Sequence, residues 1–307
     1  MPVIPVIVNA RSGPDANKDD AGDIKAAFHE HGMDAHVTVM QPDNDIARTV
    51  DAVLAGGAGL LVAGGGDGTI NAVAARLLDK DTTYGVLPLG TLNHFARDLG
   101  IPFDIAEAAT VIAADQTITV DVGEVNDRIF LNNSSIGLYP RIVAEREHAQ
   151  KRLGIGKWPA LIHATWNALR HPSSFNAVVC VDGKELHRRT PFIFVGNNAY
   201  VMEGFGIGKR ERLDAGLLSL YVLRPKTAFG LLSLGFRALF GIGSHVDDFE
   251  SFEATDFRVD SERASIMVAT DGEVNAMSTP VQFRIRARSL RVLVPVQAQA
   301  QDAGRQA

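Results

Sequence analysis

The feature that most constrains this chain is an apolar run, Leu-Val-Ala at 61–63, that leads directly into Gly-Gly-Gly-Asp-Gly-Thr at 64–69. Glycine lets the backbone turn sharply and lets a ligand approach it without meeting a Cβ atom. A helix that starts at such a turn presents N–H groups and the positive end of its dipole, which together favour a phosphate. Asp67 adds a negative charge, which fits a site where Mg²⁺ or a transferring phosphoryl group lies beside it. A tight strand-to-helix turn without a ligand is the simpler alternative.

This loop differs from two common phosphate-binding loops. It has no Gly-Lys-Ser/Thr, so it is not a Walker P-loop. It also lacks the G-x-G-x-x-G spacing, which disfavours a dinucleotide-binding Rossmann fingerprint.

Composition narrows the class of protein. A chain of 307 residues is long enough for two domains, and a formal net charge of −6 argues against a general nucleic-acid binder. The single cysteine, Cys180, excludes an internal disulfide and fits a reducing compartment. The apolar residues 3–8 have no basic stretch before them, so we expect them to form a first strand. No apolar run is long enough to span a bilayer. We therefore expect a cytoplasmic protein with at most peripheral contact at the inner face of the membrane.

The first 120 residues alternate between strand and helix patterns, which is typical of a parallel α/β sheet. We predict this α/β nucleotide-binding domain over 1–120. Its expected strands are 3–8, 35–39, 60–63 and 84–87, and its expected helices are 20–31, 45–55, 70–78 and 104–114.

The pattern after residue 120 is mainly antiparallel β, with a strong Asp-Gly hairpin signal at 182–183. We predict a β-rich domain over 121–296 and a disordered tail over 297–307. Helical inserts are expected near 157–170 and 227–240. The expected strands are 117–125, 128–134, 178–181, 185–189, 192–195, 217–223, 252–259, 264–269, 281–286 and 290–294.

Four motifs, in this order along the chain, resemble the catalytic-domain family of diacylglycerol and sphingosine kinases, with the bacterial lipid kinases as the nearest likeness. They are Asn-Ala-Arg-Ser-Gly at 9–13, the glycine loop at 64–69, Pro-Leu-Gly-Thr-Leu-Asn-His-Phe-Ala-Arg at 88–97 and Thr-Asp-Gly-Glu at 270–273. In the first motif Ala10 stands where the family has Pro. The likeness covers about residues 3–295.

The resemblance implies an α/β nucleotide-binding domain, a β-sandwich-like lipid-substrate domain and an active site in the cleft between them. It implies ATP and Mg²⁺ as cofactors and phosphorylation of a lipid hydroxyl, on a diacylglycerol-, phosphatidylglycerol- or sphingosine-like substrate, as in phospholipid metabolism. It makes Asp271 the general base, with Asp67 as a second catalytic residue, and a carboxylate that accepts the hydroxyl's hydrogen bond suits the first role. The nucleotide contacts carried over are Asn9, Ser12, Gly13, Thr38, Gly65, Gly66, Asp67, Gly68, Thr69, Asn71, Thr91 and Glu273.

Two positions depart from the family pattern. His94 stands where the family's second loop has an aspartate, and Ala215 stands where a structural metal loop has one, with the carboxylate one place earlier at Asp214. A hard cation needs several oxygen ligands at defined distances. We therefore predict that a structural Mg²⁺ at Asp214 is weak or absent.

Two segments are candidates for membrane contact. Residues 227–240 place several phenylalanines and leucines on one helical face, which suits an interfacial helix or an ordinary packed helix. Residues 141–170 contain six Lys or Arg, two Glu and two tryptophans, which suits an anionic membrane or a solvated helix. A homodimer formed through a sheet edge or the C-terminal domain is a further expectation.

Two other functions stay open at this point. An NAD kinase shares the Gly-Gly-Asp-Gly-Thr loop, but its next loop follows a different pattern from 88–97. A non-catalytic sensor of nucleotide or lipid would account for His94 and Ala215. Retention of Asp67 and Asp271 argues against a sensor, because a protein without catalysis has no chemical need for either carboxylate.

Overall fold

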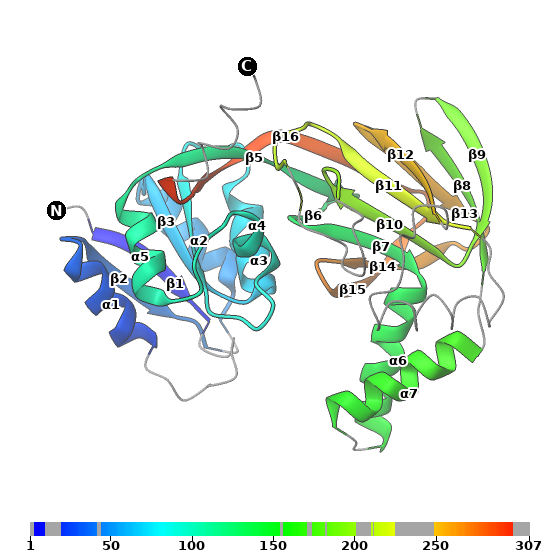
Figure 1. Ribbon diagram of the computed structural model, residues 1–307, viewed down its shortest axis with the longest axis horizontal. Helices are drawn as coiled ribbons and strands as arrows, with labels where there is room; N and C mark the ends of the chain where they lie inside the picture. The colour runs from blue at the N-terminus through cyan, green and yellow to red at the C-terminus, as the bar shows by residue number, and fades with distance from the viewer. Residues whose placement is uncertain are drawn as a thin grey trace. The chain divides into compact units, whose positions relative to one another are not determined.

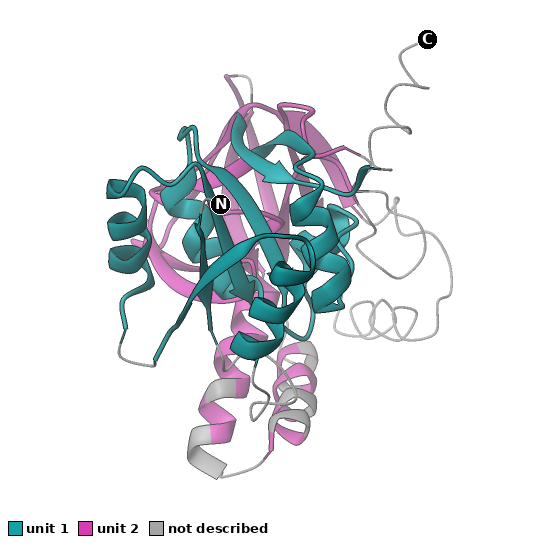
Figure 2. Ribbon diagram, turned by 90° about the vertical axis from the view of Figure 1, so that its left-hand side faces the viewer, with its two compact units in different colours: residues 1–121, 288–307 teal, residues 122–287 magenta. Residues whose placement is uncertain are grey.

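The computed structural model describes residues 3–9, 20–41, 44–153, 156–170, 174–181, 183–200, 210, 212–224 and 249–296. The chain divides into two compact units (Figure 2). Unit 1 comprises Met1–Asp121 and Arg288–Ala307, and unit 2 comprises Val122–Ala287. The predicted second domain ran to residue 296, whereas here the chain returns to unit 1 at Arg288. Strands β5 (Thr117–Val125) and β16 (Val281–Leu293) both run through this division.

Unit 1 is built on a parallel sheet with the strand order β2-β1-β3-β4 (Figure 1). These strands are β1 (Val3–Val8), β2 (Asp34–Val39), β3 (Leu60–Gly65) and β4 (Thr83–Pro88). Both faces of β3 and β4 are almost fully buried, as expected for parallel strands covered by helices. Of the helices, α1 (Asp20–Glu30) packs beside α5 (Ile105–Ala113), and α2 (Ile46–Ala55) packs beside α3 (Asp67–Leu77). The predicted α/β class of this half is confirmed.

Local capping explains where two of these helices begin. The Asp45 carboxylate accepts the N–H groups of Ala47 (2.9 Å) and Arg48 (3.4 Å) at the start of α2. The Asp104 carboxylate caps α5 in the same way. Such caps satisfy N–H groups that have no partner within the helix, so their positions could be predicted from sequence.

Unit 2 contains two packed sheets with a shared apolar core, as predicted for a β-sandwich-like domain. One sheet has the order β12-β11-β10-β7-β14-β15, all antiparallel, and in the other β16 continues to β13, β8 and β9. Phe257 and Phe283 stack in the core with ring centroids 5.0 Å apart. The remaining strands are β6 (Arg128–Phe130), β7 (Asn133–Gly137), β8 (Phe175–Val181), β9 (Lys184–Thr190), β10 (Phe192–Asn197), β11 (Leu218–Leu223), β12 (Phe249–Ala254), β13 (Asp256–Ser261), β14 (Ser265–Thr270) and β15 (Glu273–Ser278).

Three predicted strand boundaries in unit 2 are wrong. The run at 128–134 is two strands, β6 and β7, because Leu131 and Asn132 direct their N–H groups elsewhere. The run at 252–259 breaks at Thr255, where the chain changes from one sheet to the other. The two runs at 281–286 and 290–294 are a single strand, β16, with Arg288 in a left-handed conformation inside it.

Two adjacent helices interrupt the strands of unit 2 (Figure 1): α6 (Leu138–Leu153) and α7 (Lys157–Arg170). Only α7 was predicted as a separate helix, whereas most of α6 lies in the segment 141–170 that was interpreted as a membrane contact or a solvated helix. Within the described residues, no helix has the length and apolar character needed to cross a bilayer. The helix predicted at 227–240 and the tail predicted at 297–307 lie outside the described residues.

Candidate functional site

The strand order of unit 1 places two of the predicted motifs at one point of the sheet. The chain moves from β1 outward to β2 and then crosses β1 to form β3, so the order reverses between β1 and β3. In open α/β sheets, ligands bind outside the carboxyl ends of the strands at such a reversal. Asn9 follows β1 and Gly66 follows β3, so both motifs lie there.

Asn9 is bound directly to the glycine loop. Its backbone N–H donates to the Gly64 carbonyl (2.9 Å), and its Nδ2 donates to Thr69 Oγ1 (3.1 Å). Thr69 is itself buried in the first turn of α3. Two motifs separated by 60 residues therefore form one local structure.

The glycine loop leads directly into α3. Gly66 is the N-cap residue, with φ −85° and ψ 179°, and as a glycine it has no side chain to cap the helix. The N–H groups of the first helical turn have no acceptor within the helix, which makes this end suited to an anion. A Cβ atom at Gly65 would lie 2.8 Å from the Thr69 Cβ, so a side chain there would displace the first turn of the helix.

The loop after β4 is held in shape by Asn93. This buried residue is left-handed (φ 49°); its Oδ1 accepts the Gly90 N–H (3.0 Å), and its Nδ2 donates to the carbonyls of Pro88 (3.1 Å) and Gly90 (2.8 Å). The loop lies tightly against the glycine loop, because a Cβ atom at Gly90 would lie only 2.4 Å from the Gly66 Cα. The two predicted phosphate loops therefore interlock.

Asp67 joins the same two loops. Its Oδ1 accepts the backbone N–H of His94 (2.8 Å) at the start of the short helix α4 (His94–Asp98), which was not predicted. Asp67 is half-buried, while the His94 side chain is exposed. The predicted catalytic carboxylate thus also has a structural role, since it fixes the second loop against the first.

The other residues predicted to contact nucleotide are distributed around this centre. Thr38 lies on β2, opposite Ile7 of β1. Asn71 lies in the second turn of α3, and Thr91 is exposed in the loop after β4. Ser12 and Gly13 lie outside the described residues.

In unit 2, Asp271 forms the turn of the β14–β15 hairpin together with Gly272. Both residues have positive φ, 46° and 89°, as in the tight turns that favour Asp-Gly. The Asp271 carboxylate accepts three backbone N–H groups: Oδ2 accepts that of Leu131 (2.7 Å), and Oδ1 accepts those of Asn132 (2.9 Å) and Asn133 (3.0 Å). The carboxylate is therefore fixed in position, which a proton acceptor requires.

Two opposing effects act on the pKa of Asp271. Burial raises the pKa, because it disfavours the charged form, whereas the three N–H donors and the positive charge of Arg210 lower it. Burial is the largest effect, and the pKa of the carboxyl lies above its ordinary value of 3.8. A carboxylate with a raised pKa is a stronger base, which suits removal of a hydroxyl proton.

Glu273 and Asp214 also belong to unit 2. Glu273 is the exposed first residue of β15. The Asp214 Oδ1 accepts hydrogen bonds from Nε (3.2 Å) and Nη2 (3.0 Å) of Arg212, so a guanidinium already neutralises this carboxylate. Among the described residues, no group of three or more His, Cys, Asp or Glu could hold a metal ion. A weak or absent structural Mg²⁺ at Asp214 stays a prediction.

Several buried charged residues were not predicted as functional from the sequence. Arg210 is 3% exposed and binds the segment that contacts Asp271. Glu124 on β5 pairs with Arg284 and with Arg286 (3.0 Å), and Asp121 on the same strand accepts the Arg288 N–H (2.7 Å). Glu124 and Asp121 could have been found, because they are acidic residues within the apolar run 117–125. Arg210, in contrast, lies in a charged stretch that is typical of exposed surface.

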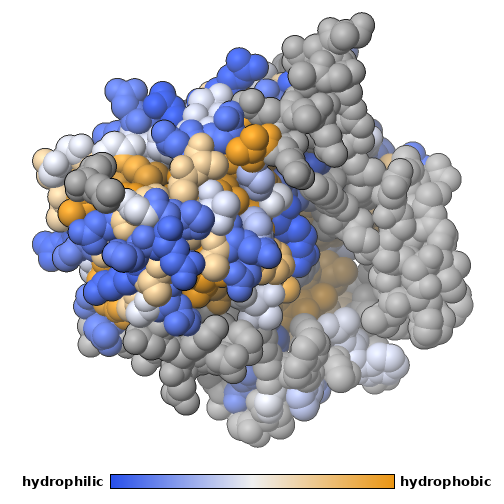
Figure 3. Space-filling view, turned by 60° about the vertical axis from the view of Figure 1, so that its left-hand side comes forward, coloured by the Kyte–Doolittle hydropathy of each residue, from blue (hydrophilic) through white to orange (hydrophobic). Residues whose placement is uncertain are grey.

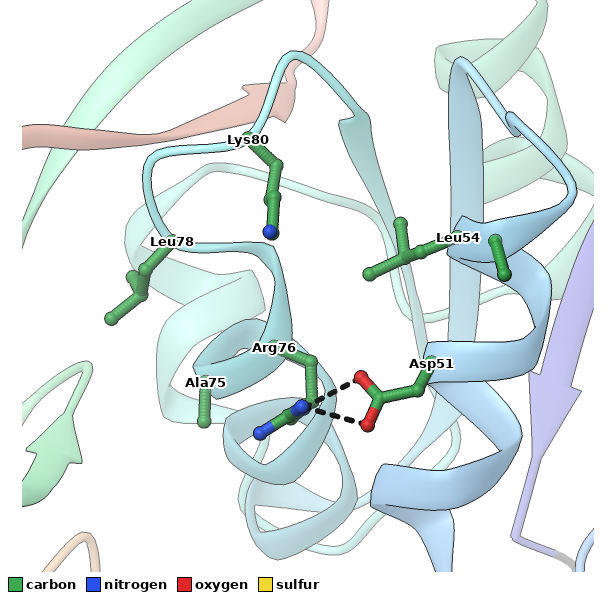
Figure 4. A pocket seen from close by; sticks show the side chains of 7 residues that line it. Asp51, Leu54, Ala75, Arg76, Leu78 and Lys80 are labelled. Carbon is green, nitrogen blue, oxygen red and sulfur yellow. Dashed lines mark hydrogen bonds and ion pairs between the residues drawn. The ribbon is translucent and has the colours of Figure 1, made fainter.

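Unit 1 also has a pocket of about 460 Å³ between the C-terminal halves of α2 and α3 (Figure 4). Asp51 and Arg76 form a two-pronged ion pair across it, at 2.9 and 2.7 Å, and Lys80 also lines it. This pocket lies at the opposite end of α3 from Asp67, so it is separate from the interlocked loops.

Comparisons with known proteins agree with this arrangement. A family model for the diacylglycerol kinase catalytic domain matches residues 4–125, and one for the YegS C-terminal NAD kinase beta sandwich-like domain matches residues 144–294. A Pseudomonas aeruginosa protein named "Probable lipid kinase YegS-like" is 31% identical over 271 residues, covering 81% of this chain and 85% of that protein. A Klebsiella pneumoniae protein of the same name is 34% identical over 166 residues, covering 53% of this chain and 56% of that protein.

Solved structures show the same fold. The structure of a diacylglycerol kinase from Bacillus anthracis matches with a TM-score of 0.69 at 22% identity, covering 96% of this chain and 97% of that chain. Both the sequence matches and the fold therefore extend through the two units. The chain belongs to the diacylglycerol kinase catalytic-domain family, together with the YegS-like lipid kinases, and is a phosphotransferase of that family.

Proposed function

We propose that this protein is an ATP-dependent lipid kinase that transfers the γ-phosphate of ATP to the hydroxyl of a diacylglycerol-, phosphatidylglycerol- or sphingosine-like lipid. The observation that carries the proposal is the pair of interlocked loops after β3 and β4, the first of which lies at the strand reversal of unit 1. There, the start of α3 and Thr69 offer N–H and hydroxyl donors to a phosphate chain, and the N-cap residue Gly66 has no side chain to compete for them.

The residues of unit 1 fit a triphosphate and its metal ion. The backbone N–H groups at the start of α3 would hold phosphate oxygens. Asp67, the first residue of α3, has a carboxylate of the kind that Mg²⁺ prefers as a ligand, and it would hold the metal ion beside the phosphates. When bound, Mg²⁺ neutralises charge on the phosphates during transfer. Asp67 meanwhile keeps the second loop in register through the His94 N–H.

Asp271 is the proposed general base. Its three N–H donors hold the carboxylate in one orientation, and the raised pKa increases its basicity toward the acceptor hydroxyl. In this proposal the carboxylate accepts the hydrogen bond of the lipid hydroxyl and takes its proton as the phosphoryl group is transferred. At a pH below the raised pKa the carboxyl is protonated and the rate should fall.

Lipid must be taken from a bilayer, and we assign peripheral contact to the α6–α7 helix pair. This segment has a net positive charge in an acidic chain, and the Trp166 side chain is 54% exposed. Basic residues with an exposed tryptophan suit an anionic lipid surface. Figure 3 shows hydrophilic side chains interspersed with apolar ones on the face that it draws. Co-sedimentation with phosphatidylglycerol vesicles should weaken in Trp166→Ala, whereas unchanged binding would assign the contact elsewhere.

The kinase proposal is tested by transfer of label from γ-labelled ATP to vesicles that contain diacylglycerol, phosphatidylglycerol or sphingosine. Wild type and Asp271→Asn are compared, with circular dichroism as the control for folding. Label in one lipid class that is lost in a folded Asp271→Asn variant supports both the activity and the base. Label that persists in this variant would refute the role of Asp271.

The same assay separates the alternative functions. Nucleotide binding without transfer to any lipid would favour a sensor, for which His94 and Ala215 are the motivation. Label in NAD, added as a soluble acceptor, would favour an NAD kinase instead.

A further inference from the structure

The segment Leu131–Asn133 comprises the short break between β6 and β7 and the first residue of β7, and all of its backbone N–H and carbonyl groups are hydrogen-bonded. Its three N–H groups all donate to the Asp271 carboxylate, from 138 to 140 residues further along the chain. The Asn133 carbonyl in turn accepts the Asp271 N–H (2.9 Å). The position of this segment therefore determines where the Asp271 carboxylate lies.

The opposite side of the segment is bound by Arg210. Its Nη1 donates to the carbonyl of Leu131 (2.7 Å) and to that of Asn197 (3.1 Å), and its Nη2 donates to the Asn132 Oδ1 (3.1 Å). The guanidinium also lies 5.8 Å from the centroid of the Tyr200 ring. One planar, buried cation thus fixes both the backbone and a side chain of the segment.

Neutral groups complete the arrangement. Asn197 Nδ2 donates to the same Leu131 carbonyl (2.9 Å), and the hydroxyl of Tyr200 donates to the Asn132 carbonyl (2.9 Å). All of these side chains are at most 9% exposed. Hydrogen bonds in such surroundings are stronger than in water, and leaving one unmade is costly.

The peptide bond between Leu131 and Asn132 connects Arg210 to Asp271. Its carbonyl accepts from the guanidinium, and its N–H donates to the Asp271 Oδ1. A cation on the carbonyl polarises the peptide and strengthens its N–H as a donor. The positive charge of Arg210 is thereby transmitted to the carboxylate through one peptide group as well as through space.

We propose that Arg210 is a positioning residue for Asp271: it clamps Leu131–Asn132 so that the N–H groups of this segment converge on the carboxylate. The inference rests on the proposed function, in which Asp271 is the base, and it adds a residue that the kinase motifs do not include. Arg210 does not contact the reacting atoms in this scheme, because it acts through the peptide.

The proposal predicts different results for two substitutions. Arg210→Gln removes the charge, so the pKa of Asp271 should rise further and the N–H groups should lose their alignment. Arg210→Lys keeps the charge but cannot donate in two directions from a plane. The pKa of Asp271 in this variant should therefore lie close to that of wild type, while the N–H groups stay misaligned as in Arg210→Gln. The field of Arg210 lowers the pKa of this carboxyl.

The test combines kinetics with a measurement that needs no activity. A ¹³C NMR titration of aspartate carboxyls, assigned by the signal missing in Asp271→Asn, gives the Asp271 pKa in wild type and variants. The pH dependence of kcat for lipid phosphorylation gives the same quantity in the working enzyme. The matched control is Arg128→Gln, which removes an exposed arginine three residues before Leu131.

We expect Arg210→Gln to raise the NMR pKa, to move the acid limb of the kcat profile to higher pH, and to lower kcat on the order of tenfold to a hundredfold at neutral pH. KM for ATP should change much less than kcat, since all of the proposed nucleotide contacts except Glu273 belong to unit 1, and Arg128→Gln should resemble wild type. An unchanged NMR pKa in a folded Arg210→Gln variant overturns the proposal, as does failure of both Arg210 variants to fold. If wild type transfers no phosphate, the proposed function fails while the NMR result still decides the role of Arg210.

Discussion

Gly90 provides the strictest test of the interlocked loops. A Cβ atom added at this position would lie 2.4 Å from the Gly66 Cα and 2.7 Å from the Asn93 Oδ1. Carbon atoms in contact normally lie about 3.5–4.0 Å apart, so Gly90→Ala must part the loops by roughly 1 Å. Both obstructing groups are fixed, since one is backbone and the other is hydrogen-bonded on both of its polar atoms.

The cost follows from the contacts that are lost. Overpacking in a well-packed region costs about 1–3 kcal/mol. The added Cβ would also lie 2.7 Å from the Asn93 Oδ1, which weakens the two hydrogen bonds between Gly90 and Asn93 within the second loop, each worth about 1 kcal/mol. We expect Gly90→Ala to lower the free energy of unfolding of unit 1 by about 2–4 kcal/mol.

Urea unfolding followed by far-UV circular dichroism measures this change. Tryptophan fluorescence would not, because Trp158 and Trp166 both belong to unit 2. The matched control is Gly59→Ala, where the added Cβ meets nothing within 4 Å and the backbone is not left-handed. We expect this control to change stability by less than about 0.5 kcal/mol. If the two variants are equally stable, the interlocking of the loops does not contribute to the stability of unit 1.

Four further predictions concern single side chains. The free energy of unfolding of wild type minus that of Asp271→Asn should be greatest at low pH. It should fall as pH rises through the folded-state pKa of Asp271, because burial raises that pKa above 3.8 and the amide does not titrate. Urea unfolding at several pH values measures this difference, and a difference that grows with pH would contradict the prediction. Tyr84→Phe should cost about 1 kcal/mol by the same method, because the buried hydroxyl donates to a backbone carbonyl at 2.9 Å, and no loss would contradict it. Asp67→Asn should abolish phosphate transfer yet unfold like wild type, since an amide oxygen can still accept the His94 N–H, whereas Asp67→Ala should also lose about 1–3 kcal/mol. Mg²⁺ without nucleotide should leave the Tm of wild type unchanged. A Tm that rises with Mg²⁺ in Ala215→Asp alone would show that the missing carboxylate at 215 accounts for the weak or absent structural Mg²⁺ site.

Local signals in the sequence were sufficient to predict most of unit 1, with α4 and the return of the chain at Arg288 as the exceptions. The Asp45 and Asp104 side chains cap helices by binding N–H groups only two or three residues further along the chain. The glycine loop likewise joins a buried strand to the helix that directly follows it. The fold class followed because alternating strands and helices allow few arrangements. The short helix α4 was missed because its first N–H is satisfied by Asp67, which lies 27 residues away.

Unit 2 depends more on contacts between distant residues, and its boundaries were predicted less well. The run 128–134 has a strand pattern throughout, yet it breaks where three N–H groups bind a carboxylate some 140 residues later. The alternation of side chains could not reveal this competition. Arg210 was overlooked for the same reason, since its burial arises from partners at 131, 132 and 197 rather than from its neighbours.

The two carboxylates singled out from the sequence are held by the same physical device. Asp67 accepts a backbone N–H from the next loop, and Asp271 accepts three from Leu131–Asn133. In each unit, therefore, the carboxylate proposed for catalysis also fixes a segment distant in sequence, and the segment fixes the carboxylate. Truncation to alanine removes charge and support together, so a loss of activity in such a variant cannot by itself assign a chemical role. Substitution by asparagine retains one acceptor oxygen, and only if that variant stays folded while transfer is lost does the charge itself carry the function.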